Sequence, residues 1–410
     1  MEYIIIGNSA AAVGTVEGIR SVDPEGKITL IADEPHHTYS RPLISYLIEG
    51  KTDREHMLYR DGNFYNRLHI NTRLGERVTA IDPAAHTVTT DAGETLHYDR
   101  LMNATGSHPF LPPMQGLETV EERTSFMSLD DADRLSEMMS PDRDLLIVGA
   151  GLIGLKCAEC ALGKVKSITV IDLADRVMPS VLDAEGAGLV QRHMEQKGVR
   201  FILAASAKEF QKNTAVLTNG QTVPFDILVT AVGVRPNVEL VKAAGGEVNR
   251  GIVVSQKGET SLPDVYAAGD CVESVDISSG EQKIMALLPN AYMGGYAAGV
   301  NMAGGRSAFE NPIPMNSIGF FGLHLVTAGS YSGEELSFRG EGEYKRLFVK
   351  DNRLVGYIII GNVRSSGIYT ALIRNKTPLD ETDFAALAEQ PALTALSRAY
   401  RDEKLGGKKQ

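Results

Sequence analysis

Two short apolar runs, about 140 residues apart, each break into small residues as a strand does when it turns sharply into a helix. The first reads MEYIIIGNSAAAVG at the start of the chain, and the second reads LLIVGAGLIGLK. The second run completes the pattern G-x-G-x-x-G, whereas the first keeps only its first glycine. We name these positions the first fingerprint (Gly7, Ser9, Ala12) and the second fingerprint (Gly149, Gly151, Gly154). Such turns hold dinucleotide phosphates at the N-terminus of the helix.

The second fingerprint has the context that a dinucleotide site requires. Gly149 permits the tight turn, Gly151 lets the backbone approach a pyrophosphate, and Gly154 lets the helix pack close to the sheet. Asp172 closes the next predicted strand, where an acid accepts hydrogen bonds from both ribose hydroxyls and repels a 2′-phosphate. The pattern therefore favours NAD over NADP. The alternative is a glycine-tolerant βα turn that binds nothing.

The first fingerprint is ambiguous when it is taken alone. Asp33 and Glu34 stand at the end of the following predicted strand (Lys27–Asp33). They lie about 20 residues beyond the first fingerprint, where an acid contacts the ribose in dinucleotide sites. Ser9 adds only a hydroxymethyl group, and its hydroxyl could donate to a phosphate. A nucleotide site and a turn without a ligand both remain open at this point.

Length, charge and cysteine content restrict the class of protein. A chain of 410 residues predicts two to three domains. The net charge of −11 argues against general nucleic-acid binding, and the basic tail near Arg398–Lys409 is interpreted as a solvated helix end. Three cysteines, no span of about 20 apolar residues and no signal peptide predict a cytoplasmic protein.

The element pattern predicts an α/β fold with two Rossmann-like dinucleotide-binding domains, the second inserted in the first. Short alternating segments after residue 75 indicate antiparallel hairpins, and helices are expected near Asp61–Leu68, from Pro289 and near Asp383–Lys404. Beyond Pro312 the pattern is mixed strand and helix, so we expect a C-terminal α+β interface domain.

Three further segments, NATGSHP, AVGVRPN and VYAAGDC, follow in fixed order around the two fingerprints. With them the chain resembles the FAD-dependent pyridine nucleotide-disulfide oxidoreductase superfamily. It looks most like the branch of rubredoxin and ferredoxin reductases, the flavin part of nitrite reductase and NADH oxidases. The resemblance implies an FAD-binding domain (1–111 and 239–311), an NAD-binding domain (112–238) and a C-terminal interface or dimerisation domain (312–410).

The resemblance also implies binding residues. Those for FAD are Gly7, Ser9, Ala10, Ala12, Asp33, Glu34, Ser40, Arg41, Pro42, Val78, Ala104, Thr105, Gly106, Gly269, Asp270, Asn290 and Ala291. Those for NAD(H) are Gly149, Gly151, Leu152, Ile153, Gly154, Asp172, Arg176, Val232 and Gly233. The first fingerprint is then the FAD site, and the helix from Asn290 would direct its N-terminus at the flavin.

Departures from the family pattern are informative. The segment YSRPLISYLIEGK contains no cysteine, so thiol relay chemistry from this position is excluded. Tyr46 stands where related ferredoxin reductases have Lys, and Lys156 stands where the family has Glu after the second fingerprint. We hypothesise that this pair replaces the family pair near the flavin–nicotinamide contact. A solvated lysine on the helix rim is the alternative.

The remaining cysteines and histidines do not suggest a metal site. Cys157 and Cys160 lie three residues apart on one predicted helix and cannot complete a zinc site, so we interpret them, with Cys271, as buried thiols.

The expected activity is an FAD-dependent oxidoreductase that takes hydride from NADH and passes electrons to a redox protein or a partner subunit. The alternatives are an NADH oxidase that reduces oxygen directly and, in another class, an FAD-dependent redox-sensing or interaction protein. A homodimer through the C-terminal domain is a further expectation.

Overall fold

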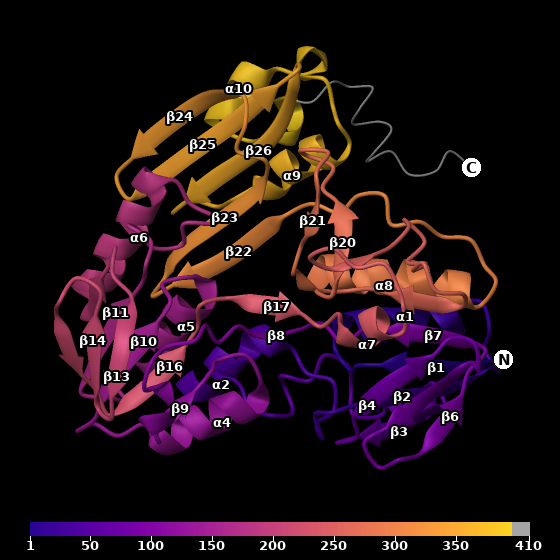
Figure 1. The fold of residues 1–410 in the computed structure, drawn as a ribbon. Helices are drawn as coiled ribbons and strands as arrows, with labels where there is room; N and C mark the ends of the chain where they lie inside the picture. The colour runs from indigo at the N-terminus through magenta and orange to yellow at the C-terminus, as the bar shows by residue number, and fades with distance from the viewer. Residues whose placement is uncertain (396–410) are drawn as a thin grey trace. The chain divides into compact units, whose positions relative to one another are not determined.

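The computed structural model describes residues 1–395, which form two compact units (Figure 1). Unit 1 comprises Met1–Arg176, Gly198–Ser274 and Gln282–Pro312. Unit 2 comprises Val177–Lys197, Val275–Glu281 and the chain from Ile313 onward. Both fingerprints therefore lie in unit 1.

Unit 1 contains two five-stranded parallel sheets, one beside each fingerprint. The first has the spatial order β19 (Val265–Ala267), β7 (Arg100–Asn103), β1 (Glu2–Ile6), β2 (Lys27–Ala32) and β3 (Ile70–Leu74). The second has the order β12 (Val199–Ile202), β11 (Ser167–Ile171), β10 (Asp144–Val148), β16 (Ile227–Thr230) and β9 (Arg123–Thr124). The apolar strands β1 and β10 are each buried over four consecutive residues, as expected for central strands of a sheet covered on both faces.

Helix α1 (Ala10–Arg20), which follows the first fingerprint, packs directly on α8 (Leu288–Met302). Four glycines permit this contact: Gly14, Gly18, Gly295 and Gly299. A Cβ at Gly295 would lie only 2.1 Å from the carbonyl oxygen of Ala11, so no larger residue fits there. Helix α8, from the last sequence segment of unit 1, thus positions the helix of the first fingerprint.

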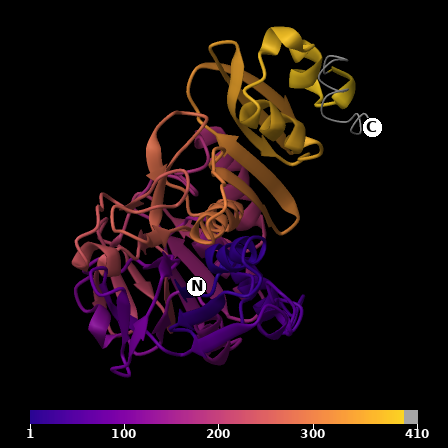
Figure 2. The same ribbon diagram turned by 90° about the vertical axis from the view of Figure 1, so that its right-hand side faces the viewer.

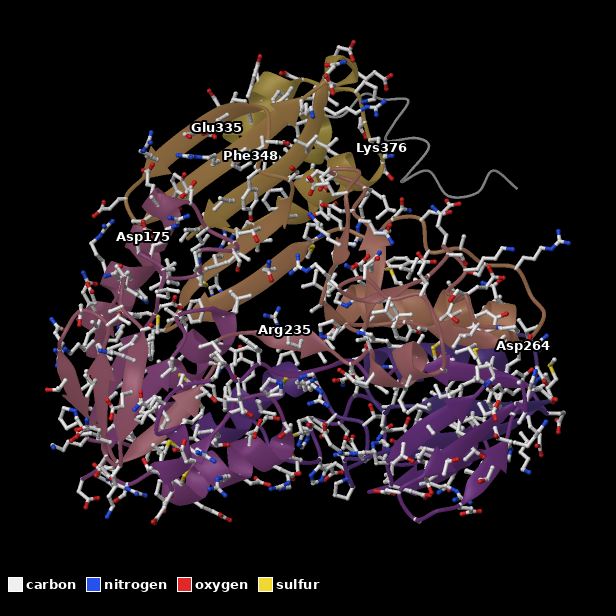
Figure 3. The ribbon with its side chains drawn as sticks, in the orientation of Figure 1. Asp175, Arg235, Asp264, Glu335, Phe348 and Lys376 are labelled. Atoms are coloured by element: carbon white, nitrogen blue, oxygen red, sulfur yellow. The ribbon has the colours of Figure 1, made fainter. Side chains whose placement is uncertain are left out.

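Antiparallel segments complete unit 1. The two three-stranded sheets are β4 (Val78–Asp82), β5 (Thr87–Thr90) and β6 (Thr95–His97), and β13 (Ala207–Gln211), β14 (Thr214–Leu217) and β15 (Thr222–Pro224). A ribbon of β8 (Ser107–Pro109) and β17 (Val234–Pro236) carries the chain between the two halves of the unit. Arg235, labelled on this ribbon in Figure 3, lies over the Phe110 ring at 4.2 Å.

The other short elements of unit 1 connect these sheets. The helices are η1 (Arg41–Leu43), α2 (Ile44–Glu49), α3 (Phe64–Arg67), η2 (Leu117–Thr119), α4 (Leu129–Met138), α5 (Leu152–Ala161) and α7 (Glu239–Ala243). The remaining strands, of which β20 ends just beyond the unit, are β18 (Ile252–Val253), β20 (Val272–Val275) and β21 (Gln282–Ile284).

Unit 2 is built on one antiparallel sheet. Its order is β22 (Met315–Phe320), β23 (Leu323–Gly329), β26 (Arg353–Ile360), β25 (Glu343–Lys350) and β24 (Glu334–Gly340). Figure 2 shows α9 (Ser366–Arg374) and α10 (Phe384–Glu389) against one face of this sheet. In the chain, η3 (Leu379–Glu381) lies between these two helices and η4 (Leu393–Ala395) follows α10. Helix α6 (Ala184–Gln196) also belongs to unit 2, because its N-cap Asp183 accepts a hydrogen bond from the Tyr344 hydroxyl at 2.5 Å.

The predicted fold class is confirmed, since both parallel βαβ sheets and the C-terminal sheet are present. One helix prediction is wrong in extent. Helix α10 ends at Glu389 instead of continuing toward Lys404, because Pro391 disfavours a helical conformation at Gln390. The rest of that expected helix, with the basic tail, lies outside the described residues. No helix in residues 1–395 has the length and apolar character that a membrane crossing requires.

Candidate functional site

The first fingerprint is a strained turn that only glycine can form. Gly7 follows β1 with φ at +115°, and a Cβ there would lie 2.2 Å from the carbonyl oxygen of Ala104. Its N–H donates to Ile31 at 2.8 Å. Ser9 then caps α1 in an extended conformation, with φ at −109°, which any residue can adopt. The turn therefore requires glycine at the first position and tolerates serine at the second.

A cavity of about 630 Å³ opens beside this turn. Thirteen of the residues predicted for FAD line it: Gly7, Ser9, Ala10, Asp33, Glu34, Arg41, Val78, Ala104, Thr105, Gly106, Gly269, Asp270 and Ala291. Its size suits a large organic cofactor. In the described part of the chain, four predicted residues do not line it: Ala12, Ser40, Pro42 and Asn290.

Sequence reasoning missed several residues of the cavity wall. They include Asn8, His36, His37, Tyr39, Arg77, Glu239 and Leu240. Asn8 could have been found, because it occupies a variable position inside the first fingerprint. The others come from the segment after β2, from the chain before β4 and from α7, and only the fold brings these parts to one wall.

The two acids after β2 have different surroundings. Glu34 accepts a hydrogen bond from the Tyr39 hydroxyl at 2.6 Å and pairs with the Arg41 guanidinium. Asp33 is 60% exposed, with the Arg77 guanidinium 3.6 Å away. Glu34 therefore orients Arg41 beside the cavity, and Asp33 is the more available of the two carboxylates for a ribose.

Asp270 is a half-buried acid of the cavity wall. Burial raises the pKa of its carboxyl, while a hydrogen bond from Ser107 at 3.3 Å and the positive charge of Arg41 act in the opposite direction. A carboxyl in this environment is suited to hydrogen bonding with hydroxyl groups of a ligand.

The second fingerprint repeats the geometry of the first. Gly149 has φ at +117°, and a Cβ there would lie 2.2 Å from the carbonyl oxygen of Ala231. A Cβ at Gly154 would lie 1.9 Å from the Gly149 oxygen, which explains the third glycine. A Cβ at Gly151 would meet no atom within 4 Å among the described residues, so the space above the helix start is open.

The other residues predicted for NAD(H) are arranged around this turn. Leu152 and Ile153 are the first residues of α5, and Val232 and Gly233 follow Ala231. The Asp172 carboxylate accepts the N–H groups of Ala150 at 2.6 Å and Ala174 at 2.8 Å, which fixes it beside the fingerprint. Arg176 lies further along, where its guanidinium pairs with Asp175 at 2.9 Å.

Comparison with known proteins decides the family. Residues 1–295 match the pyridine nucleotide-disulphide oxidoreductase family, and residues 314–377 match the C-terminal domain of rubredoxin NAD⁺ reductase. This chain belongs to the pyridine nucleotide-disulphide oxidoreductase family. This is the family that the sequence motifs implied.

Similar proteins cover most of the chain. Nitrite reductase [NAD(P)H] of Bacillus subtilis (strain 168) is 29% identical over 419 residues, 98% of this chain and 51% of the relative. The chain thus spans about half the length of that relative. The NADH-dependent phenylglyoxylate dehydrogenase subunit epsilon of Aromatoleum evansii is 28% identical over 92% of both chains. A solved NAD-dependent persulfide reductase from A. fulgidus superposes with a TM-score of 0.85 at 27% identity, covering 94% of this chain and 79% of that one.

The cavity beside the first fingerprint fits the FAD of this family. It has the volume for a dinucleotide and a carboxyl at Asp270 that can accept from hydroxyl groups. A Cβ at Gly7 would lie 2.2 Å from the carbonyl oxygen of Ala104, so the turn presents only backbone to the cavity, as close approach of a pyrophosphate requires.

In this member of the family, the two residues that depart from the family pattern meet. Tyr46 on α2 and Lys156 on α5 lie together, with Lys156 Nζ 5.0 Å from the centre of the Tyr46 ring. The same ammonium is 2.5 Å from Oε2 of Glu159, a partner that sequence reasoning missed. The Lys156 side chain is only 14% exposed, so the picture of a solvated rim lysine is wrong. Lys156 is the fifth residue of α5, beyond the first turn.

The cysteines are not placed for thiol chemistry. Cys157, Cys160 and Cys271 are all buried, and burial raises the pKa of Cys271 to about 11. Among residues 1–395, no group of three or more His, Cys, Asp or Glu side chains could hold a metal ion. Helix α2 itself contains no cysteine, so it could not supply a thiol relay to a bound flavin.

Proposed function

We propose that this chain oxidises NADH at the second fingerprint, reduces FAD at the first, and passes the electrons to a redox protein or partner subunit. The observation that carries the proposal is the repeated turn geometry within one compact unit. The absence of cysteine from the sequence of α2 favours an external acceptor over a thiol. The relative from A. evansii, which is a subunit by name, supports the partner-subunit form.

In this proposal, the chain's own residues bind and orient the cofactors. Bound FAD would supply the hydride acceptor and the outlet for electrons. The N–H groups at the starts of α1 and α8 favour negative charge near the first fingerprint, and Arg41 adds a positive charge that Glu34 holds in place. Asp172 would accept from the ribose hydroxyls of NADH and disfavour the 2′-phosphate of NADPH.

We also propose that Tyr46 and Lys156 position the nicotinamide relative to the flavin. Their contact joins α2 of the first half to α5 of the second, and it would therefore respond to how the two nucleotides meet. Lys156→Glu reverses the charge beside Glu159 and should slow flavin reduction by NADH about tenfold, measured by stopped-flow absorbance. The exposed Lys164→Glu is the matched control. An unchanged reduction rate in Lys156→Glu would show that the pair has no such role.

The main test mixes the purified yellow protein with NADH or NADPH without oxygen and follows bleaching of the flavin band. Rapid bleaching with NADH, slower bleaching with NADPH and re-oxidation by an added rubredoxin- or ferredoxin-like protein are the expected results. Rapid oxygen uptake with NADH alone would instead support the NADH oxidase alternative. Slow turnover with every acceptor, together with a redox-dependent change in oligomer size, would support a redox sensor. No bleaching with either nucleotide would contradict the proposal.

The domain ranges and the oligomeric state are part of the same proposal. We infer an FAD domain (1–111 and 239–311), an NAD domain (112–238) and a C-terminal domain (312–410) that pairs two copies. Sedimentation of the chain with and without residues 312–410 tests the last point, and an unchanged monomer mass in the full chain would contradict it.

A further inference from the structure

Helix α4 begins with three acids, Asp130, Asp131 and Asp133, which have different partners. Asp131 holds the start of its own helix. Its carboxylate accepts from the N–H groups of Met127 at 2.9 Å and Ser128 at 3.0 Å, and its own N–H donates to Oγ of Ser128 at 3.0 Å. This capping box fixes the first turn of α4. The other two acids reach partners outside the helix.

Asp130 and Asp133 both pair with the part of the chain that carries the first fingerprint. Nη2 of Arg54 donates to both carboxylate oxygens of Asp133, at 2.6 and 2.7 Å. Nε2 of His36 lies 2.6 Å from Oδ1 of Asp130. His36 and Arg54 follow β2 of the first parallel sheet, whereas α4 follows β9 of the second. The two pairs therefore join the two halves of unit 1.

Two further hydrogen bonds reach the start of α4 from the same segment. The Arg41 guanidinium donates to the carbonyl oxygen of Met127 at 3.1 Å, and the N–H of Leu129 donates to the Tyr39 hydroxyl at 3.0 Å. Helix α2, in the same segment, also packs on α4 (Figure 1). The contacts from the first half thus concentrate on residues 127–133.

Helix α4 is firmly attached to the half of the second fingerprint. Its buried side chains are Leu129, Ala132, Leu135 and Met138. It packs on β9, whose sheet also contains β10, and β10 ends directly before Gly149. A shift of α4 relative to the first half would therefore move the second fingerprint relative to the first.

We propose that Arg54 and Asp133 are a positioning pair, which sets the spacing of the two nucleotide turns and so the rate at which NADH loses a hydride to FAD. Among residues 1–395, the wall of the cavity beside the first fingerprint includes neither of them, so the pair acts at a distance from FAD. The Arg54 side chain is 57% exposed and that of Asp133 is 38% exposed. An exposed ion pair is weak and is screened by salt, so it shifts the population of the aligned arrangement severalfold. This inference rests on the proposed function and adds a positioning pair to it.

Charge reversal tests the pair. Arg54→Asp places like charges beside Asp130 and Asp133, and should slow flavin reduction at saturating NADH about fivefold, measured by anaerobic stopped-flow absorbance. The dissociation constant of NADH, taken from the dependence of that rate on NADH concentration, should stay within about twofold of the wild type. The charge-swapped variant Arg54→Asp/Asp133→Arg regains opposite charges and should recover the rate to within about twofold.

A second ion pair supplies the matched control. Arg67 pairs with Asp61 at 3.0 Å with similar exposure, but both residues lie in the first half. Arg67→Asp should therefore leave the reduction rate within about twofold of the wild type. Raising the ionic strength to about 1 M should slow the wild type at saturating NADH and leave Arg54→Gln/Asp133→Asn unchanged, because only the wild type has a pair to screen.

Three results would overturn the proposal. The first is an unchanged reduction rate in Arg54→Asp, and the second is a slow rate that persists in the charge-swapped variant. The third is weaker NADH binding without a slower reduction rate, because this would make the pair part of NADH binding.

Two measurements keep these results separate from other failures. Circular dichroism melting checks that Arg54→Asp is folded, and should it not fold, Arg54→Gln replaces it with an expected loss of about twofold in rate. Failure of the proposed function would show as missing flavin reduction by NADH in the wild type, whereas failure of this inference requires a wild type that is reduced.

Discussion

The first and second fingerprints share one feature and differ in two. Their first glycines have φ values of +115° and +117°, and a Cβ at either would lie 2.2 Å from a backbone oxygen of the neighbouring segment. At the second position, Ser9 and Gly151 are both extended, with φ at −109° and −79°. At this position the backbone does not require glycine, so Ser9 is no defect of the first fingerprint.

The third position shows which backbone segment each of the two fingerprint helices packs against most closely. Gly154 lies against its own turn, since a Cβ there would be 1.9 Å from the Gly149 oxygen. Ala12 has a methyl group and is fully buried, so α1 cannot approach its turn in that way. Helix α1 instead makes its close contact with α8 through glycines further along. A fingerprint can therefore lack its later glycines when another element, here α8, packs closely against its helix.

Replacing the first glycines should have the largest effect and should be equal in both halves. Gly7→Ala and Gly149→Ala each force a Cβ into a backbone carbonyl at positive φ, and should lower the free energy of unfolding by about 4 kcal/mol. Urea denaturation measures this, with Gly367→Ala as a control because no atom lies within 4 Å of its Cβ in the described residues. A large loss of unfolding free energy in only one of the two variants would contradict the equivalence of the two turns.

The third position should respond asymmetrically. Gly154→Ala should cost about 3 kcal/mol, because the clash involves backbone. The reverse change in the other half, Ala12→Gly, removes only a methyl and some helix propensity, and should cost about 1 to 2 kcal/mol. The same denaturation experiment compares them, and equal losses would contradict the assignment of different packing partners.

The half-buried carboxyl of Asp270 should make the stability of the first half depend on pH. Burial raises the pKa of Asp270 above its ordinary value of 3.8, so ionisation of this group costs folding stability in FAD-depleted protein. That cost is absent below the ordinary pKa and grows as pH rises through the raised one. Asp270→Asn should therefore melt higher than the wild type at neutral pH, by about 2 °C, with the difference vanishing near pH 4. A constant difference across pH would be inconsistent with this origin.

The second position should show the smallest effect on stability. Gly151→Ser copies the residue of the first fingerprint into open space and should change the free energy of unfolding by less than about 0.5 kcal/mol. It should nevertheless weaken NADH binding severalfold, since the added side chain occupies the ligand's approach. Titration calorimetry measures the binding, and unchanged affinity would show that both fingerprints tolerate serine equally.

The fold could be predicted from local patterns to a large extent. The runs before Gly7 and Gly149, and the returning strands after them, predicted both βαβ units. The end of α10 could also have been predicted, because Pro391 was visible in the sequence. The packing of α6 in unit 2 could not, since that helix lies within the sequence range of the second half and only its contacts with the sheet assign it.

The candidate site was predicted in part. Motifs located thirteen of the residues that line the cavity, because close approach of backbone to phosphate restricts residue types at fixed spacing. His37, Tyr39 and Arg77 have no such restriction, since a side chain from any loop of the right length can reach the wall. Two departures from the family pattern singled out Tyr46 and Lys156, whereas their contact with each other and the partner Glu159 were seen only in the structure.

The sequence by itself determined the two nucleotide turns, their order and the absence of a thiol relay on α2. These follow from local rules: positive φ demands glycine, and chemistry demands a side chain that is present or missing. The tertiary structure alone decided which acid holds Arg41, which helix replaces the missing third glycine, and which acid of α4 pairs with Arg54. Those outcomes depend on distances between segments far apart in the chain, and no local pattern encodes such distances.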